Sequence, residues 1–171
     1  ADGATARQIE ILRGPAALLY GSGAIGGLVN VVNERIPAAL EDHIGGQAEV
    51  RYSSVDRGRN GSASIDGSAG NIGFHIDGNA RRAADYKIPG PQSDAGRLRR
   101  SFSDQETFGA GASLVGDWGY AGASVSRLDN LYGTPSEEGA RIDMEQTRYD
   151  VDSMFKKPLA GLESVRFKLG Y

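Results

Sequence analysis

The chain has 171 residues and no cysteine, which excludes disulfides and thiol chemistry within it. No apolar run approaches the roughly 20 residues of a transmembrane helix, so a helical membrane span is excluded as well. The net charge of -3 disfavours a nucleic-acid partner, because no basic stripe dominates the sequence.

A glycine-rich segment near the start contains a literal G-x-G-x-x-G at Gly21–Gly26, a pattern found in dinucleotide-binding folds. That function needs a strand before the first glycine and a helix after the last one. Here the order is reversed: Pro15 suits a first helical position, and residues 16–20 predict a short helix that a glycine closes. Residues 28–33 are rich in β-branched side chains and predict a strand. We therefore interpret the glycines as tight turns in a compact domain.

From about residue 45 the chain alternates polar and apolar residues, the pattern of strands with two different faces. Ile72 and Ile76, for example, share one face of a predicted strand, and His75 and Asp77 share the other. The predicted strands are 47–53, 62–69, 72–80, 107–116, 120–128, 147–157 and 164–171.

The predicted connections alternate in length. Tight turns near Asn71, Trp118 and Gly161 alternate with a turn near Asp56 and with long polar segments, about 84–105 and 130–145. Outer-membrane β-barrels have short periplasmic turns and longer extracellular loops. A soluble β-sandwich binding module is the alternative, but its loops need not alternate in length. The pattern therefore favours part of a transmembrane antiparallel β-barrel.

The predicted polar faces carry too much charge for the packed interior of a small barrel and suit a wide, wet lumen. The charged residues are Arg148, Asp150, Asp152, Arg166 and Lys168. Four aromatic residues fit interfacial girdles or ordinary strand positions equally well, namely Tyr52, Trp118, Tyr149 and Tyr171.

Several spaced motifs resemble, in the same order, the second half of the plug domain of TonB-dependent outer-membrane receptors. They are Ile9–Pro15 (IEILRGP), Leu19–Gly21 (LYG), Ala24–Gly27 (AIGG) and Val29–Val32 (VNVV). The resemblance implies a mainly β fold: 1–36 as the C-terminal part of a small α+β plug, 37–44 as a linker, and 45–171 as about seven N-terminal strands of a transmembrane β-barrel.

The same resemblance implies energy-coupled import of a scarce nutrient across a bacterial outer membrane. The expected partners are TonB, a nutrient ligand and outer-membrane lipid, with no cofactor and no enzymatic activity. An iron chelate such as a siderophore is the first expected cargo, and haem, zinc and cobalamin are alternatives. A passive pore or an adhesin is the second function that we keep open.

The chain is expected to be a piece of a larger receptor. A plugged transporter barrel has about 22 strands, and about seven are predicted here. The first half of the plug and the N-terminal segment that contacts TonB have no match in this sequence.

Arg13 and, less strongly, Glu10 are expected from the resemblance to contact opposite charges on the inner barrel wall. A plain surface charge would explain either residue. His75 and Asp77 are weak candidates for metal ligation, since both face the predicted lumen, but a solvated lumen lining explains them equally well. The same applies to His43, which follows two acidic residues in the linker.

Two charged loop segments are further candidates for binding. The Arg97–Arg100 run suits an anionic ligand or a lipid headgroup, although a solvated loop is the simpler interpretation. Acidic residues near the second long loop suit a cation, namely Glu137, Glu138, Asp143 and Glu145. No catalytic residue is assigned, because the sequence has no G-x-S-x-G elbow, Walker motif or zinc-helix motif.

Overall fold

The computed structural model describes residues 8–13, 27–32, 35–88, 96–134, 140–159 and 161–171. The chain divides into two compact units, Ala1–Glu34 and Arg35–Tyr171. The short helix predicted at 16–20 and the turns predicted at Gly21–Gly26 lie outside the described residues. Within the described part of the chain, no helix is long and apolar enough to cross a membrane.

The first unit contains a two-stranded antiparallel sheet made of β1 (Gln8–Arg13) and β2 (Gly27–Val32). The register pairs Ile9 with Val31 and Ile11 with Val29, so β-branched residues oppose one another along the pair. The strand predicted at 28–33 is thus found. The plug assignment of residues 1–36 stays a prediction.

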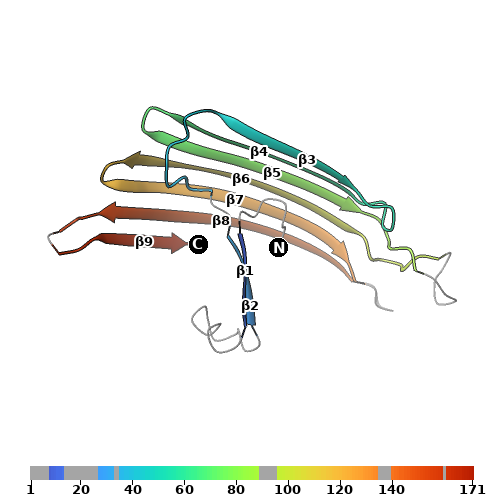
Figure 1. Ribbon diagram of the computed structural model, residues 1–171. Coiled ribbons are helices and arrows are strands. Elements are labelled where there is room, and N and C mark those ends of the chain that lie inside the picture. Colours follow the sequence, from blue (N-terminus) through green and yellow to red (C-terminus); the bar gives the residue numbers. More distant parts are fainter. Residues whose placement is uncertain (1–7, 14–26, 33–34, 89–95, 135–139, 160) are drawn as a thin grey trace. The chain divides into compact units, whose positions relative to one another are not determined.

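The second unit is one antiparallel sheet of seven strands in which each strand pairs with its neighbours in the sequence. The strands lie side by side in chain order, and the connections gather at the two ends of the sheet (Figure 1). They are β3 (Gly45–Tyr52), β4 (Arg59–Ala69), β5 (Ile72–Ala83), β6 (Ser103–Gly116), β7 (Gly119–Gly133), β8 (Arg141–Lys156) and β9 (Ser164–Gly170). The seven predicted strands are therefore confirmed.

The strand ends next to the short turns agree with the prediction, but those next to the long connections do not. β5 continues to Ala83 instead of ending at residue 80, and β6 begins at Ser103 instead of 107. β7 and β8 likewise reduce the second predicted loop from 130–145 to 134–140. These extensions carry charges on both faces, so the alternation fades, while backbone pairing continues because it does not depend on side-chain polarity.

The third predicted tight turn is found near Gly161, where the Leu162 N–H donates to the Leu159 carbonyl at 3.1 Å, but it lies within a longer connection. β8 and β9 are joined through residues 157–163, where the Lys157 N–H donates to the Glu163 carbonyl at 2.8 Å. The other two turns are as short as predicted, at Gly70–Asn71 and Asp117–Trp118.

The sheet has an apolar face and a polar face, as the alternation predicts. Ile65, Ile76, Ala110, Val125 and Tyr149 form one row across neighbouring strands, because the register places each opposite the next. The four larger side chains of this row are exposed. Among the described residues, no large side chain is fully buried. The described residues of the second unit form a single sheet, and none of them covers its apolar face, whereas a soluble sandwich buries that face between two sheets.

The connection between β3 and β4 is held by a buried carboxylate. Asp56 is buried, and its Oδ1 accepts a 3.0 Å hydrogen bond from the Gly58 N–H. Its own carbonyl accepts a 2.8 Å bond from the Ala84 N–H, which ties this connection to the one after β5. The Ser53 side chain, followed by the Gly58 N–H, holds the pKa of Asp56 below its ordinary value against the opposing effect of burial.

This arrangement predicts a pH-dependent contribution to stability. A carboxylate whose pKa is lower in the folded state stabilises the fold above its unfolded pKa of about 3.9, and this stability is lost as the pH falls through the folded pKa. Asp56→Asn in the complete protein should therefore lower the thermal midpoint at pH 7. The difference from wild type should shrink below about pH 4. Asp104→Asn, at an exposed pair with Arg82, is the control and should show little change. A gap for Asp56→Asn that stays constant from pH 7 to pH 3 would contradict this account.

Candidate docking site on the polar face

The segment that begins the second unit is bound on the polar face of the sheet. Arg35 reaches Asp77 of β5 with two hydrogen bonds, Nε to Oδ1 at 2.5 Å and Nη2 to Oδ2 at 2.8 Å. The side chains are only 10% and 2% exposed. This is a bidentate guanidinium–carboxylate pair shielded from water, a geometry that lysine does not reproduce.

Glycines make room for this segment. A Cβ added at Gly109 would overlap the Arg35 side chain, and one at Gly111 would overlap the Arg35 carbonyl. One at Gly122 would lie 2.6 Å from Ile36 Cγ2. All three positions belong to the polar face, since the register places Gly109 opposite Asp77 and Gly111 opposite His75, and Gly122 lies on the same face of β7. We call them the glycine floor, and they let a second backbone approach the sheet closely.

The chain beyond Arg35 continues along the same sheet. The Ser113 hydroxyl donates to the Pro37 carbonyl at 2.5 Å, and the Glu41 N–H donates to the Ser68 hydroxyl at 2.8 Å. These contacts extend the docked region from Arg35 into the predicted linker at 37–44. The linker is therefore bound to strand residues through its backbone at Pro37 and Glu41, while its side chains from residue 38 to residue 44 are exposed.

Asp77 also belongs to a wider charge network. His75 Nε2 lies 3.2 Å from Asp77 Oδ1, and His75 Nδ1 lies 2.6 Å from Asp66 Oδ1. Asp66 is the cross-strand partner of His75, which explains why the two side chains meet. Both ring nitrogens face carboxylate oxygens, and an imidazolium that donates from both of them satisfies that arrangement. The chain Asp66–His75–Asp77–Arg35 alternates in charge.

The weak metal candidates therefore lie inside this network. The structure brings His75 and Asp77 together as predicted from their shared face, but Arg35 engages both oxygens of Asp77. Among the described residues, no group of three or more His, Cys, Asp or Glu is arranged to hold a metal ion. Metal ligation here stays a hypothesis that would require Arg35 to leave.

The two plug residues singled out by resemblance lie in the other unit. Arg13 is the last residue of β1 and is paired with Gly27, and Glu10 is paired with Asn30. Their contact with a barrel wall stays a prediction. His43 is exposed, as are its acidic neighbours.

The Arg97–Arg100 run lies in the first long connection, as predicted, whereas part of the second charged segment lies in a strand. Arg97 forms an isolated bridge with Lys87 and donates to the Asp85 carbonyl, so its segment is tied back to the chain after β5. Asp143 and Glu145 lie in β8 rather than in a loop, because that strand begins at Arg141. Glu145 pairs with Arg127 at 2.7 Å. Glu137 and Glu138 lie outside the described residues.

Arg35 is the residue that sequence reasoning missed. It was included in the predicted plug, with no partner named. A signal was present in the strand predicted at 107–116, where Gly109 and Gly111 occupy consecutive positions of the polar face. Two such glycines leave the strand backbone without side chains on that face, which indicates that another backbone lies against it.

A curved antiparallel sheet has one apolar face and one polar face, and the segment around Arg35 lies on the polar face, as is expected of part of the wall of a β-barrel. No protein family model matches the chain. It is 39% identical over 71 residues to the probable TonB-dependent siderophore receptor PirA of Acinetobacter baumannii, covering 42% of this chain and 8% of the receptor. It is 26% identical over 167 residues to the ferric enterobactin receptor of Pseudomonas aeruginosa, covering 96% of this chain and 18% of the receptor.

Among solved structures, the FrpB iron transporter of Neisseria meningitidis (F3-3 variant) has a similar fold. The TM-score is 0.74 at 16% sequence identity, covering 99% of this chain and 29% of the transporter. The chain is thus similar in sequence to a siderophore receptor and a ferric enterobactin receptor, and similar in fold to an iron transporter. The chain spans 8% and 18% of the lengths of the two receptors that it matches.

The docking site predicts that loss of Asp77 releases the segment around Arg35. Breaking a buried pair by removing one partner costs about 3–5 kcal/mol, because the other charge is left uncompensated. In the complete receptor, Asp77→Ala should therefore speed tryptic cleavage after Arg35 by about tenfold or more. Gly111→Val, which keeps both charges but removes the space for the Arg35 backbone, should do the same.

Asp104→Ala is the matched control, because it removes an exposed partner of Arg82 instead of a buried one. It should leave the cleavage rate after Arg35 unchanged. Resistance to trypsin that is equal in all variants would show that Arg35 is not held by this site.

Proposed function

We propose that this chain is the junction of plug and barrel in an outer-membrane receptor that imports an iron chelate with energy supplied through TonB. The observation that carries the proposal is the docked segment Arg35–Pro37 on a polar sheet face, at the start of the unit that follows residues 1–34. Matches to a siderophore receptor and a ferric enterobactin receptor support the choice of cargo. Relatives that are transport receptors also favour a non-enzymatic role.

The polar face suits the lining of a wet channel. Arg166 Nη2 lies 2.7 Å from Asp152 Oδ2, and Lys168 Nζ lies 3.6 Å from the same oxygen. Arg148 pairs with Asp150 at 2.8 Å on the same strand. Such charges are expensive in a dry interior but are compatible with a hydrated one, where water shares their solvation. A lumen of this kind can let a plug move without separating a large dry apolar interface.

The docked segment has a separate role in this proposal. A force applied to the plug produces movement relative to the barrel only if some part of the chain stays attached to the wall. The Arg35–Asp77 pair and the Ser113–Pro37 hydrogen bond supply that attachment at the start of the barrel unit. Because the pair is buried and bidentate, it resists release more strongly than an exposed pair would.

Energy coupling is tested by removing TonB. Uptake of a radioiron-labelled siderophore by cells that carry the complete receptor should be abolished in a strain lacking TonB. Binding of the same ligand at the cell surface should remain, because recognition precedes the energy-requiring step. Uptake that persists in that strain would indicate the passive pore instead, and binding of cells or surfaces without any uptake would indicate the adhesin.

The cargo is tested separately by growth conditions. Expression of the complete receptor should rise under iron starvation and not under zinc starvation. Haem supplied as the sole iron source separates a haem receptor from a siderophore receptor. Induction by zinc starvation alone would overturn the choice of iron.

Arg13 is proposed to pair with a lumenal carboxylate and help keep the channel shut at rest. A charged, hydrated contact is strong in place yet can be exchanged for water during movement. Arg13→Ala in the complete receptor should raise the sensitivity of cells to large antibiotics while barrel assembly stays intact. Arg13→Lys is the matched variant and should give an intermediate effect, since it keeps the charge and loses the planar fork. An Arg13→Ala receptor that assembles, excludes those antibiotics and imports normally would show Arg13 to be a surface charge only.

A further inference from the structure

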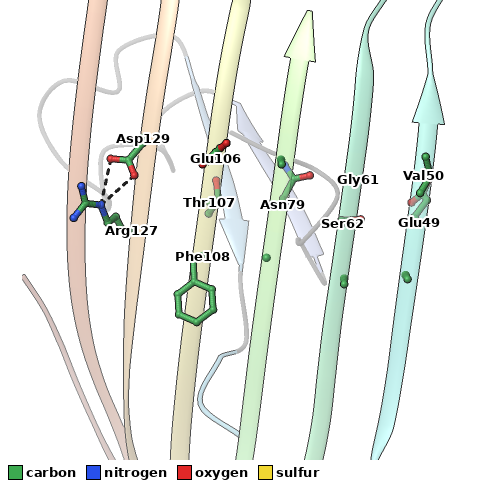
Figure 2. Close-up of a pocket in the computed structure, with 14 residues that line it drawn as sticks. Glu49, Val50, Gly61, Ser62, Asn79, Glu106, Thr107, Phe108, Arg127 and Asp129 are labelled. Atoms are coloured by element: carbon green, nitrogen blue, oxygen red, sulfur yellow. Dashed lines mark hydrogen bonds and ion pairs between the residues drawn. The ribbon is translucent and has the colours of Figure 1, made fainter.

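The two faces of the sheet exchange their polarity at the outer ends of β7 and β8. On the apolar face, the paired residues Val125 and Tyr149 are followed, toward the long connection, by Arg127 and Thr147. Figure 2 shows Arg127 paired with Asp129 on this face of β7. A strand crosses a membrane with about 9–11 residues, whereas β7 has 15 and β8 has 16. In the proposed function, both strand ends therefore stand outside the bilayer, around the extracellular mouth of the barrel.

The polar face of the same strand ends carries apolar side chains. Tyr132 of β7 and Ile142 of β8 are paired in the register, and both are half-buried. Met144 follows Ile142 on this face and is 39% exposed. Leu128, four positions before Tyr132, shares its face because successive residues of a strand alternate. We call Leu128, Tyr132, Ile142 and Met144 the mouth patch.

Amide and hydroxyl groups lie among these apolar side chains. Asn130 is paired with Met144 on one side and with Gln105 on the other, and Thr107 is paired with Leu128. Asn130 Oδ1 and Thr107 Oγ1 are buried and have no hydrogen-bond partner among the described residues. Buried polar atoms in proteins are nearly always paired with protein, water or ligand groups. The mouth patch therefore combines apolar surface with hydrogen-bonding groups that still need partners.

Charge is absent from this part of the polar face. At the outer ends of β6, β7 and β8, every charged side chain belongs to the opposite face, namely Asp104, Glu106, Arg127, Asp129, Arg141, Asp143 and Glu145. Nearer the short turns, the polar face of β8 is charged again at Arg148 and Asp150. The change from a charged wall to an uncharged patch thus occurs within one strand, at the level where the strand leaves the bilayer.

We propose that the mouth patch determines which iron chelate the receptor accepts, by binding aromatic rings that are joined through amides. A ring stacks on Tyr132 and contacts the sulfur of Met144, and both are favourable contacts for an aromatic face. Amide groups of the chelate pair with Asn130 and Thr107. This inference rests on the proposed function, because it requires the outer strand ends to stand where the cargo enters.

Other iron ligands fit the mouth patch less well. A chelate made of carboxylates needs cations, and the patch offers none. A porphyrin presents a wide apolar plane that would leave Asn130 and Thr107 without partners. An aliphatic hydroxamate chelate satisfies the hydrogen-bonding groups but brings no aromatic face to Tyr132 and Met144. Aromatic rings linked by amides match both properties of the patch.

The test uses the complete receptor, purified in detergent and titrated calorimetrically with ferric enterobactin, ferrichrome, ferric citrate and haem. Ferric enterobactin, which has aromatic rings attached through amides, should bind most tightly. Met144→Ala should weaken its binding by about tenfold, since several apolar atoms lose their contact. Tyr132→Leu keeps an apolar side chain and removes the ring, so it should weaken ferric enterobactin more than the aliphatic ferrichrome.

Leu131→Ala is the matched control, because it shortens an apolar side chain next to Tyr132 on the opposite face of β7. It should leave the affinity for ferric enterobactin unchanged. Equal affinities for the four ligands, tightest binding of any of the other three, equal losses in Leu131→Ala and Met144→Ala, or equal weakening of ferric enterobactin and ferrichrome by Tyr132→Leu would each overturn the inference. The titration involves no uptake, so the expected binding in a receptor that fails the TonB test would overturn the proposed function alone.

Discussion

The buried pair between Arg35 and Asp77 is the interaction on which the docked segment depends. Within the sheet, every strand contacts only its sequence neighbours, so the sheet by itself gives the preceding chain no fixed position. The pair joins residues 42 positions apart and brings the start of the second unit onto β5. The docked segment then packs closely on the glycine floor, and its Pro37 carbonyl accepts a hydrogen bond from Ser113.

This contact also accounts for the unusual composition of the polar face near β6. A strand that lines a wet lumen ordinarily carries polar side chains at alternate positions, as β8 does with Arg148, Asp150 and Asp152. β6 carries Gly109 and Gly111 instead, where any side chain would occupy the space of Arg35. The same face thus carries exposed charges on β8 and a buried contact with Arg35 at β5 and β6.

The two faces of the sheet divide the chemistry of the protein. The polar face holds the network from Asp66 to Arg35, which joins the segment around Arg35 to β5. The apolar face has no cover among the described residues of the second unit and presents large aliphatic and aromatic side chains. Successive residues of a strand point to opposite faces, so a slip of one residue in the pairing of a strand would exchange its polar and apolar faces. The hydrogen-bonded pairing from β3 to β9 fixes the register and keeps the two faces separate.

The sequence by itself determined the strands, their faces and the short turns, because alternation and turn chemistry are local properties. Ile72 and His75 were assigned to opposite faces from spacing alone, and the structure agrees. It also determined that His75 and Asp77 lie together, since residues two apart on a strand share a face. Only the tertiary structure decided that Arg35 is their partner and that β5 to β8 run past the point where alternation fades. The physical reason is that both depend on cross-strand register: the partner of a charge and the end of a hydrogen-bonded ladder are set by residues far away in the chain.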